Sequence, residues 1–200
     1  MSGHAHRDDF GSKLGMWLFL VTEMVLFGGL FIAYSYMRHR YPAEFHHGGA
    51  ELNVTLGVIN TLVLLTSSLT VVLSIVAIQR GEKKSVMGFL GTTIGLGFVF
   101  LIIKSFEWAA KFHHGLYPNA PYLATLPPGE QLFFGLYFVM TGLHGLHVVA
   151  GMAVLTWILR KVAKDEVRQD RYIHLENGGL YWHLVDVIWI FLLPLFYLAA

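Results

Sequence analysis

Five long apolar stretches alternate with shorter polar segments along the chain. They cover about residues 13–36, 54–78, 86–108, 132–159 and 180–199. Because a helix rises about 1.5 Å per residue and the hydrocarbon layer of a bilayer is about 30 Å thick, each stretch is long enough to cross a membrane as a helix. The pattern predicts an all-α integral membrane protein: a polar tail at residues 1–12, followed by one domain of five transmembrane helices at residues 13–200.

The Lys and Arg residues in and near the connecting segments are unequally distributed between the two sides of the membrane. With five crossings, the tail and the loops after the second and fourth spans share one side and carry ten of them, whereas the opposite side carries three. By the positive-inside rule, the amino terminus is cytoplasmic and the carboxyl terminus is periplasmic. The first apolar run is too long for the core of a signal peptide, so we expect it to stay in the protein as a signal anchor.

Composition agrees with a membrane location and excludes several classes of protein. Hydrophobic residues make up 55% of the chain and charged residues 14%, and the mean hydropathy is +0.56. The chain has no cysteine, which excludes disulfides, iron–sulfur clusters, thiolate copper centres and thioether-linked haem. A formal net charge of +1 without a basic block argues against nucleic-acid binding.

A carboxylic acid, Glu23, lies near the middle of the first span. An ionisable group at that depth costs at least ~2.5 kcal/mol, so Glu23 is expected to face the other helices. His144 and His147 of the fourth span lie at a similar depth and are the expected hydrogen-bond partners, followed by Ser67 of the second. A neutral acid bonded to a neutral imidazole avoids burying charge. The bond either fixes helix packing or tunes a proton-conducting or stabilising contact with a partner subunit.

Small and polar residues in the second and third spans predict close helix packing. On the second span they recur every seven residues, as expected for a face packed against another helix, at Asn53, Asn60, Ser67 and Ser74. A polar pore lining would show a similar stripe. The third span opens with four glycines that let a neighbouring backbone come close, Gly88, Gly91, Gly95 and Gly97, of which Gly91 and Gly95 form a GxxxG pair. Lys104 and Glu107 share a helix face and predict a structural ion pair, with an acid placed for ion handling as the alternative.

The histidines of the last two spans raise the question of a bound haem. His144 and His147 point from the fourth span into the bundle, and His183 and Asp186 lie one turn apart on the fifth. The first two share a helix and His183 lies nearer the cytoplasmic end, so no axial pair is predicted and haem is disfavoured. A transporter would explain the buried acids but usually has broken helices in repeated halves, which are not evident. A helical partner subunit is the remaining class.

Five segments, one in each span, resemble subunit III of the haem-copper terminal oxidases in its short, five-helix bacterial form. They are WLFLVTEMVLFGGLF around Glu23, VINTLVLLTSS from Val58, KSFEWAAKFHHGLYP around Glu107, TGLHGLHVVAG from Thr141 and YWHLVDVIWIFLLPLFYL from Tyr181. A buried acid or an HxxH pair is weak evidence by itself, but TGLHGLHV together with WHLVDVIW and the TE span is highly specific. The longer members of this family, the cytochrome c oxidase subunit III family, have two additional helices at the amino terminus, which this chain lacks.

The resemblance implies a subunit without a catalytic site, haem, copper or other metal centre of its own in the inner membrane of a bacterium. It would be bound to oxidase subunit I, which holds the haems and copper, and to other oxidase subunits. The complex would reduce oxygen with electrons from cytochrome c or quinol and translocate protons. The family is thought to stabilise the catalytic subunit and to support its proton uptake. The same five-helix family includes accessory proteins of nitric oxide reductases, and this is the alternative.

The resemblance also assigns residues. Buried polar positions of the family match this chain at Glu23, Glu107, His144, His147, His183 and Asp186, whereas Lys104 matches no charged position of the family. The family binds phospholipid within its bundle, and we expect lipid or a partner helix to complete the bundle at the first two spans. Lipid phosphates would meet basic residues outside, at Arg38 and Arg40, or on the cytoplasmic side, at Arg80, Lys83 and Lys84.

Overall fold

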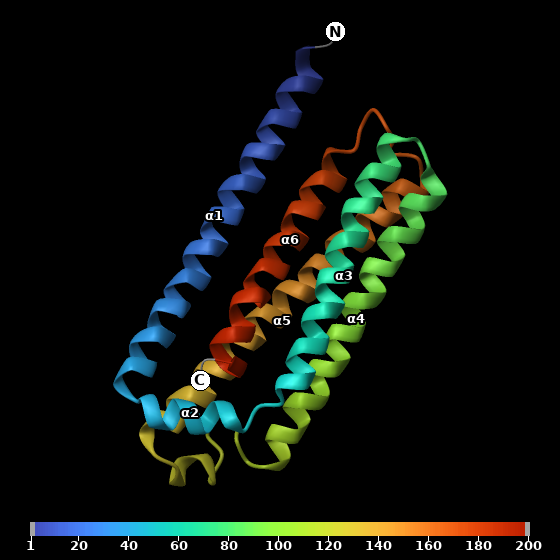
Figure 1. Cartoon of the computed structure of the whole chain (residues 1–200). Helices are drawn as coiled ribbons and strands as arrows, with labels where there is room; N and C mark the ends of the chain where they lie inside the picture. The colour runs from blue at the N-terminus through green and yellow to red at the C-terminus, as the bar shows by residue number, and fades with distance from the viewer. Residues whose placement is uncertain (1–2, 199–200) are drawn as a thin grey trace.

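The computed structural model describes residues 3–198, with side chains from Phe10 onward. Five long helices run up and down the molecule, and the two ends of the described chain lie at opposite ends of it (Figure 1). Within residues 10–198, five helices are long and apolar enough to cross a membrane, which confirms the predicted architecture. The long helices are α1 (Gly3–Arg40), α3 (Val54–Gln79), α4 (Lys83–His113), α5 (Pro128–Ala163) and α6 (Ile173–Leu193).

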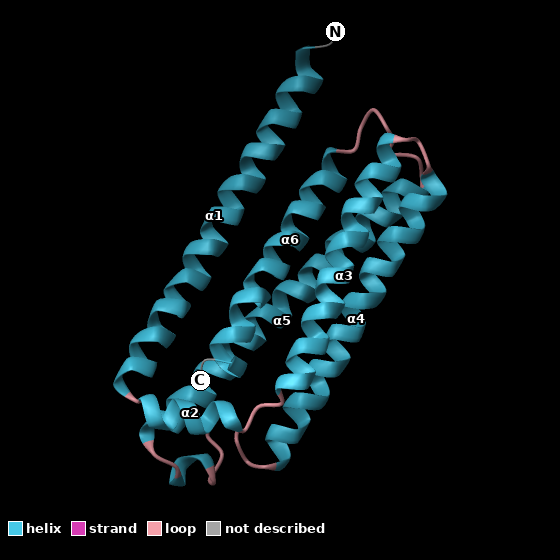
Figure 2. Cartoon of the chain, in the orientation of Figure 1, coloured by secondary structure: helices cyan, strands magenta, loops and turns pink. Residues whose placement is uncertain are grey.

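Three short helical elements lie at the end of the molecule where the described chain ends. Pro42 opens α2 (Pro42–Ala50), a position where the missing N–H of proline is no loss. The Pro-rich loop between α4 and α5 contains one 3-10 turn, η1 (Leu123–Thr125). A π-helical turn, η2 (Pro194–Leu198), continues α6. Figure 2 shows that loops occur at the two ends of the molecule and not along the helices.

The long helices extend beyond the apolar stretches that predicted them. Helix α1 begins at Gly3. The polar residues between Gly3 and Lys13 therefore belong to the same helix as the apolar run that starts at Lys13. The last predicted span was drawn to residue 199, which lies outside the described residues. The cytoplasmic location of the amino terminus stays a prediction of the positive-inside rule.

Helices α3–α6 form a packed bundle. Its interior holds large, fully buried side chains, among them Phe100, Trp182 and Trp189. Polar side chains join the helices inside it: Trp182 Nε1 donates to Ser67 Oγ at 3.0 Å, and the hydroxyls of Thr70 and Thr93 lie 2.7 Å apart. The predicted polar stripe of α3 therefore faces other helices and is packed.

One of the four residues of the predicted stripe has a different role from the others. Asn60, Ser67 and Ser74 are fully buried, but Asn53 lies before the helix and caps it, because its side chain accepts from the backbone N–H of Leu56 at 3.1 Å. The first residue of the predicted stripe thus determines where α3 begins rather than how it packs.

The glycines of α4 divide between two faces. A Cβ placed on Gly97 would meet Met152 Sδ at 2.7 Å, so this glycine allows α5 to approach closely. A Cβ on Gly91 or Gly95 would meet no described atom within 4 Å. The predicted close approach is therefore confirmed at Gly97. Within the described part of this chain it is wrong at the GxxxG pair, because those two glycines face outward.

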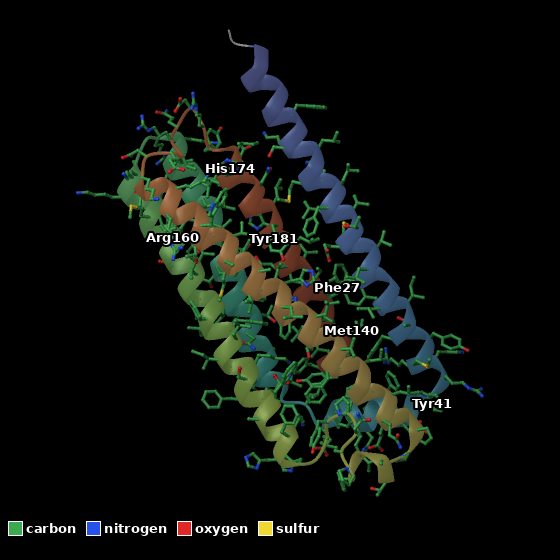
Figure 3. All side chains as sticks on the ribbon, turned by 180° about the vertical axis from the view of Figure 1, so that it is seen from behind. Phe27, Tyr41, Met140, Arg160, His174 and Tyr181 are labelled. Atoms are coloured by element: carbon green, nitrogen blue, oxygen red, sulfur yellow. The ribbon has the colours of Figure 1, made fainter. Side chains whose placement is uncertain are left out.

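Helix α1 stands apart from α3 and α4 and lies against α5 and α6 (Figure 1). Figure 3, seen from behind, shows Phe27 of α1 and Tyr181 of α6 among the side chains that occupy the space between α1 and its neighbours. Phe27 is 1% exposed, whereas Val25 and Ile32 of the same helix are 70% and 72% exposed. One face of α1 is packed and the rest is open to lipid.

Candidate functional site

Glu23 on α1 is hydrogen-bonded to His147 on α5. Glu23 Oε2 lies 2.9 Å from His147 Nε2, as the depths of the two residues in their spans predicted. His147 Nδ1 lies 2.8 Å from the backbone oxygen of Leu143. The other two predicted partners do not reach Glu23: the His144 ring packs against Trp189 inside the bundle, and Ser67 donates to the Leu64 carbonyl and accepts from Trp182.

The geometry of His147 places one proton between it and Glu23. A carbonyl oxygen can only accept a hydrogen bond, so Nδ1 must carry a proton. The Nε2–Oε2 contact then holds a single further proton, either on the acid, with both groups neutral, or on the imidazole, as an ion pair. Each of the two side chains is 14% exposed, and Phe27 packs edge-on against the imidazole at 5.4 Å. Such apolar surroundings penalise separated charge.

A second polar cluster, formed by Lys104, Glu107, Tyr137 and Tyr197, is buried where α4, α5 and η2 meet. The Lys104 ammonium donates three hydrogen bonds, to Glu107 Oε2 at 3.2 Å, Tyr137 Oη at 3.0 Å and Tyr197 Oη at 2.7 Å. Both phenols donate to Glu107 Oε1, at 2.7 and 2.5 Å. Every polar hydrogen of this cluster has a partner. That closure fits the structural interpretation of the Lys104–Glu107 pair better than an ion-handling role.

His144 lies next to this cluster and is fully buried. Its ring lies against Trp189, tilted by 31° with centroids 5.2 Å apart, and forms a T-shaped contact with Phe100 at 5.6 Å. The Lys104 ammonium lies 5.2 Å from the Trp189 ring centroid. Neither ring nitrogen of His144 has a hydrogen-bond partner among the described residues. The two histidines of the TGLHGLHV segment therefore have different surroundings, since only His147 reaches an acid.

His183 and Asp186, which lie one turn apart on α6, both face Ser68 of α3. His183 Nδ1 lies 2.6 Å from Ser68 Oγ of α3, and the other side of its ring faces a cavity beside α1. Asp186 is 3% exposed, and its carboxyl faces the Ser68 hydroxyl without a hydrogen bond of ordinary geometry in the described part of the chain. A carboxylate in this position would be very unfavourable, so the residue is best accommodated as the neutral acid.

The cavity beside α1 has a volume of about 460 Å³ and lies between α1 and α6. It is lined by Trp17, Leu20, Met24, Phe27, Gly28, Phe31, Leu180, His183, Leu184, Val187, Ile188 and Phe191. A second cavity, of about 270 Å³, is polar and lies near α2, where His47 Nδ1 is 3.2 Å from Glu130 Oε1. Among the side chains of residues 10–198, no group of three or more His, Asp or Glu is arranged to hold a metal ion.

The predicted lipid-phosphate residues lie at both ends of the molecule. Arg38 and Arg40 are exposed in the last turn of α1, and Arg80 and Lys84 are exposed at the loop between α3 and α4. Lys83 already has partners in this chain, because its ammonium lies 2.8 Å from Asp165 Oδ1 and donates to the Ala163 carbonyl at 2.9 Å. The hydrogen bond from Lys83 to the Asp165 carboxylate and the charge of Lys83 lower the pKa of this exposed carboxyl.

Neither tyrosine of the buried cluster was selected as a site residue from the sequence. Tyr137 lies four and seven residues before Thr141 and His144, so the helical spacing that selected those residues also contains the signal for Tyr137. Tyr197 carries no such signal, because it follows Pro194 in a π-helical turn with a different period.

A family model described as cytochrome c oxidase subunit III matches residues 1–200. Cytochrome c oxidase subunit 3 of Thermostichus vulcanus is 32% identical over 98% of this chain and 92% of that protein. The probable quinol oxidase subunit 3 of Staphylococcus saprophyticus is 31% identical over 94% of this chain and 89% of that protein. The haem-copper oxidase subunit I+III of Aeropyrum pernix is 29% identical over 94% of this chain and 22% of that protein. These matches do not support the nitric oxide reductase alternative.

Proposed function

The chain belongs to the cytochrome c oxidase subunit III family, and from this premise we propose that it stabilises the catalytic subunit of a bacterial inner-membrane respiratory oxidase and supports proton uptake by that subunit. Its relatives are subunits of cytochrome c oxidases and quinol oxidases. The relative whose name joins subunits I and III in one chain supports subunit I as the direct partner. The electron donor is set by other subunits of the complex.

The observation that carries the proposed role in proton uptake is the hydrogen bond between Glu23 and His147. It joins an acid on α1, the most exposed of the five long helices, to an imidazole on α5. In our proposal the two groups share one proton near the middle of the membrane. A packing contact alone needs no titrating proton. In our proposal, the shared proton keeps α1 docked during turnover and so keeps the surface presented to subunit I constant.

Phospholipid is the second part of the proposal. The open sides of α1 are apolar and end in exposed Arg38 and Arg40, which suit acyl chains and a phosphate respectively. Arg80 and Lys84 are the corresponding candidates at the opposite end, whereas Lys83 is less suited because it is paired with Asp165. Haem and copper would be in partner subunits, in keeping with a family whose subunit III lacks its own redox centre.

The test compares Glu23→Gln with Glu23→Ala in the purified oxidase complex. The change to glutamine keeps a hydrogen-bond donor for His147 Nε2 but removes the titrating proton, whereas the change to alanine leaves the imidazole unpaired at a cost of ~1–3 kcal/mol. Thr22→Val is the matched control, since Thr22 is exposed and bonds to its own helix. We expect Glu23→Gln to retain the subunit but to lower turnover at alkaline pH and to inactivate sooner. If Glu23→Gln behaves as the parent while Glu23→Ala loosens the subunit, the bond has a packing role only.

A further inference from the structure

The cavity between α1 and α6 lies at the centre of the membrane. Its α1 residues run from Trp17 to Phe31, in the middle of a span that extends from Phe10 to Arg40. This span of 31 residues is longer than the hydrocarbon layer, which about 20 residues of helix cross. The cavity therefore occupies most of the depth of that layer, and a charged lipid head group, which stays at the interface, would lie beyond its ends.

Both ends of the cavity are closed by polar contacts between α1 and α6 or its continuation. At one end, Lys13 Nζ lies 2.8 Å from Glu176 Oε2, and Asn177 Nδ2 donates to Ser12 Oγ at 2.9 Å. At the other end, Tyr34 Oη donates to the Leu195 carbonyl at 2.5 Å. A molecule in this cavity has to enter sideways, from the core of the bilayer.

The wall of the cavity is apolar apart from His183 and the indole of Trp17. The Ser68 hydroxyl occupies His183 Nδ1, and Nε2 has no hydrogen-bond partner among residues 10–198. An acyl chain in the cavity would leave this nitrogen unpaired, which is unfavourable in an apolar setting. An occupant with one hydrogen-bonding group satisfies it.

We propose that this cavity binds the ring of an isoprenoid quinone, hydrogen-bonded through a ring oxygen to Nε2 of His183. Such a molecule is apolar, resides in the core of the bilayer and carries its polar atoms on a flat ring. Trp17, Phe27, Phe31 and Phe191 provide aromatic faces for that ring. The volume of about 460 Å³ lies within the range of small-molecule sites.

The contact between Ser68 and His183 lets one site bind both redox forms of the ring. When the Ser68 hydroxyl donates to Nδ1, Nε2 carries the proton of the neutral imidazole and donates to a quinone carbonyl. When Nδ1 donates to Ser68, Nε2 accepts from a quinol hydroxyl. Rotation of one hydroxyl together with a change of tautomer is sufficient for the exchange, and binding requires no electron transfer in this chain.

The test is photolabelling of native membranes that contain the complete chain and its partners, with an azido-ubiquinone as probe. We expect label on peptides that span residues 17–31 and 180–191, and its loss when excess unlabelled quinone is added. Gly28→Leu should abolish the label by filling the cavity, because Gly28 lines it and an added Cβ meets no described atom within 4 Å. Gly29→Leu is the matched control, since that glycine is equally unobstructed but does not line the cavity.

His183→Leu separates the hydrogen bond from the shape of the cavity. It keeps an apolar wall and removes one hydrogen bond, so labelling at a fixed probe concentration should fall by about fivefold. The proposal is overturned if the label appears on other subunits alone, or if Gly28→Leu and Gly29→Leu label equally. It is also overturned if a phospholipid with an azido group on its acyl chain labels the same peptides and is not displaced by quinone. These readouts do not depend on whether the chain supports proton uptake.

Discussion

In the most apolar 18-residue stretch of helix α1, 11% of the residues are buried inside the protein. In the most apolar 18-residue stretch of α6, 50% of the residues are buried. The bundle α3–α6 is held by large side chains and by a buried ion cluster. α1 is held at Ser12, Glu23 and Tyr34, which bond to α6, α5 and η2 respectively. These residues are 11 positions apart, about three helical turns, and so lie along one face of α1.

The difference follows from the solvent. Lipid tails are as apolar as leucine, so apolar side chains alone give little preference for a helix neighbour over lipid. A bundle with many interlocking side chains gains enough from close packing, but a single peripheral helix does not. α1 is therefore the part of the molecule in which individual hydrogen bonds decide whether the helix stays docked.

The largest effect is expected in the bundle, for Lys104→Met. This change leaves the buried Glu107 without its cation, which typically costs ~3–5 kcal/mol. The measurement is the free energy of unfolding by SDS titration in the purified complex. Lys84→Met, at an exposed position next to the α3–α4 loop, is the control, and the double variant Lys104→Met with Glu107→Gln should recover most of the loss. Equal values for Lys104→Met and Lys84→Met would show that the buried cluster does not hold the bundle.

An intermediate effect, confined to α1, is expected for Tyr34→Phe. The change removes the hydrogen bond to the Leu195 carbonyl, worth ~1 kcal/mol, and keeps the buried ring. Backbone amides in the last turns of α1 should exchange hydrogen for deuterium faster while those of α3–α6 do not change. Tyr36→Phe is the control, because Tyr36 is 66% exposed. Faster exchange throughout the bundle would contradict the separation of the two regions.

The smallest effect is expected for Asp165→Asn in the loop between α5 and α6. Lys83 lowers the pKa of Asp165 in the folded protein below its ordinary value of 3.8. Their contact therefore stabilises the folded loop at pH values above 3.8, and this stabilisation is lost as the pH falls through the lowered pKa. Proteolytic nicking of the loop should therefore increase at acidic pH in the parent. In Asp165→Asn, nicking should be slightly higher than in the parent at neutral pH and should not change over the same acidic range. Asp170→Asn is the control, because Asp170 Oδ2 lies 4.0 Å from Arg171 Nε and makes only a weak contact. This variant should be nicked at the same rate as the parent.

Hydropathy was sufficient to predict the five helices, and depth in the membrane was sufficient to predict the contact between Glu23 and His147. Both follow from one-dimensional properties, since a helix converts residue number directly into height. Height along the helix does not say which way each helix is rotated about its own axis, and so does not say which side chains face a neighbouring helix. For this reason the sequence suggested a neighbour at Gly91 and Gly95, which face outward, and did not separate His144 from His147.

The remaining parts depend on contacts between distant segments. Tyr197 reaches Lys104 because Pro194 is followed by a π-helical turn, and no periodicity in the sequence marks that turn. Ser68 was not selected, although it lies beside Ser67 of the polar stripe, because its neighbour His183 comes from a helix 115 residues later. The cavity between α1 and α6 is likewise a property of two faces that only the folded chain brings together.

The attachment of α1 also has a consequence for synthesis. Glu23 precedes His147 by 124 residues, and Tyr34 precedes Leu195 by 161. At about 5–20 residues per second, a ribosome takes roughly 6–25 s to translate the interval between Glu23 and its partner. Throughout that time α1 is already inserted, with its acid facing lipid or the insertion machinery. Helix α1 thus enters the membrane well before its partners, and the nascent chain is most vulnerable to loss of α1 until the fourth span brings His147 to Glu23.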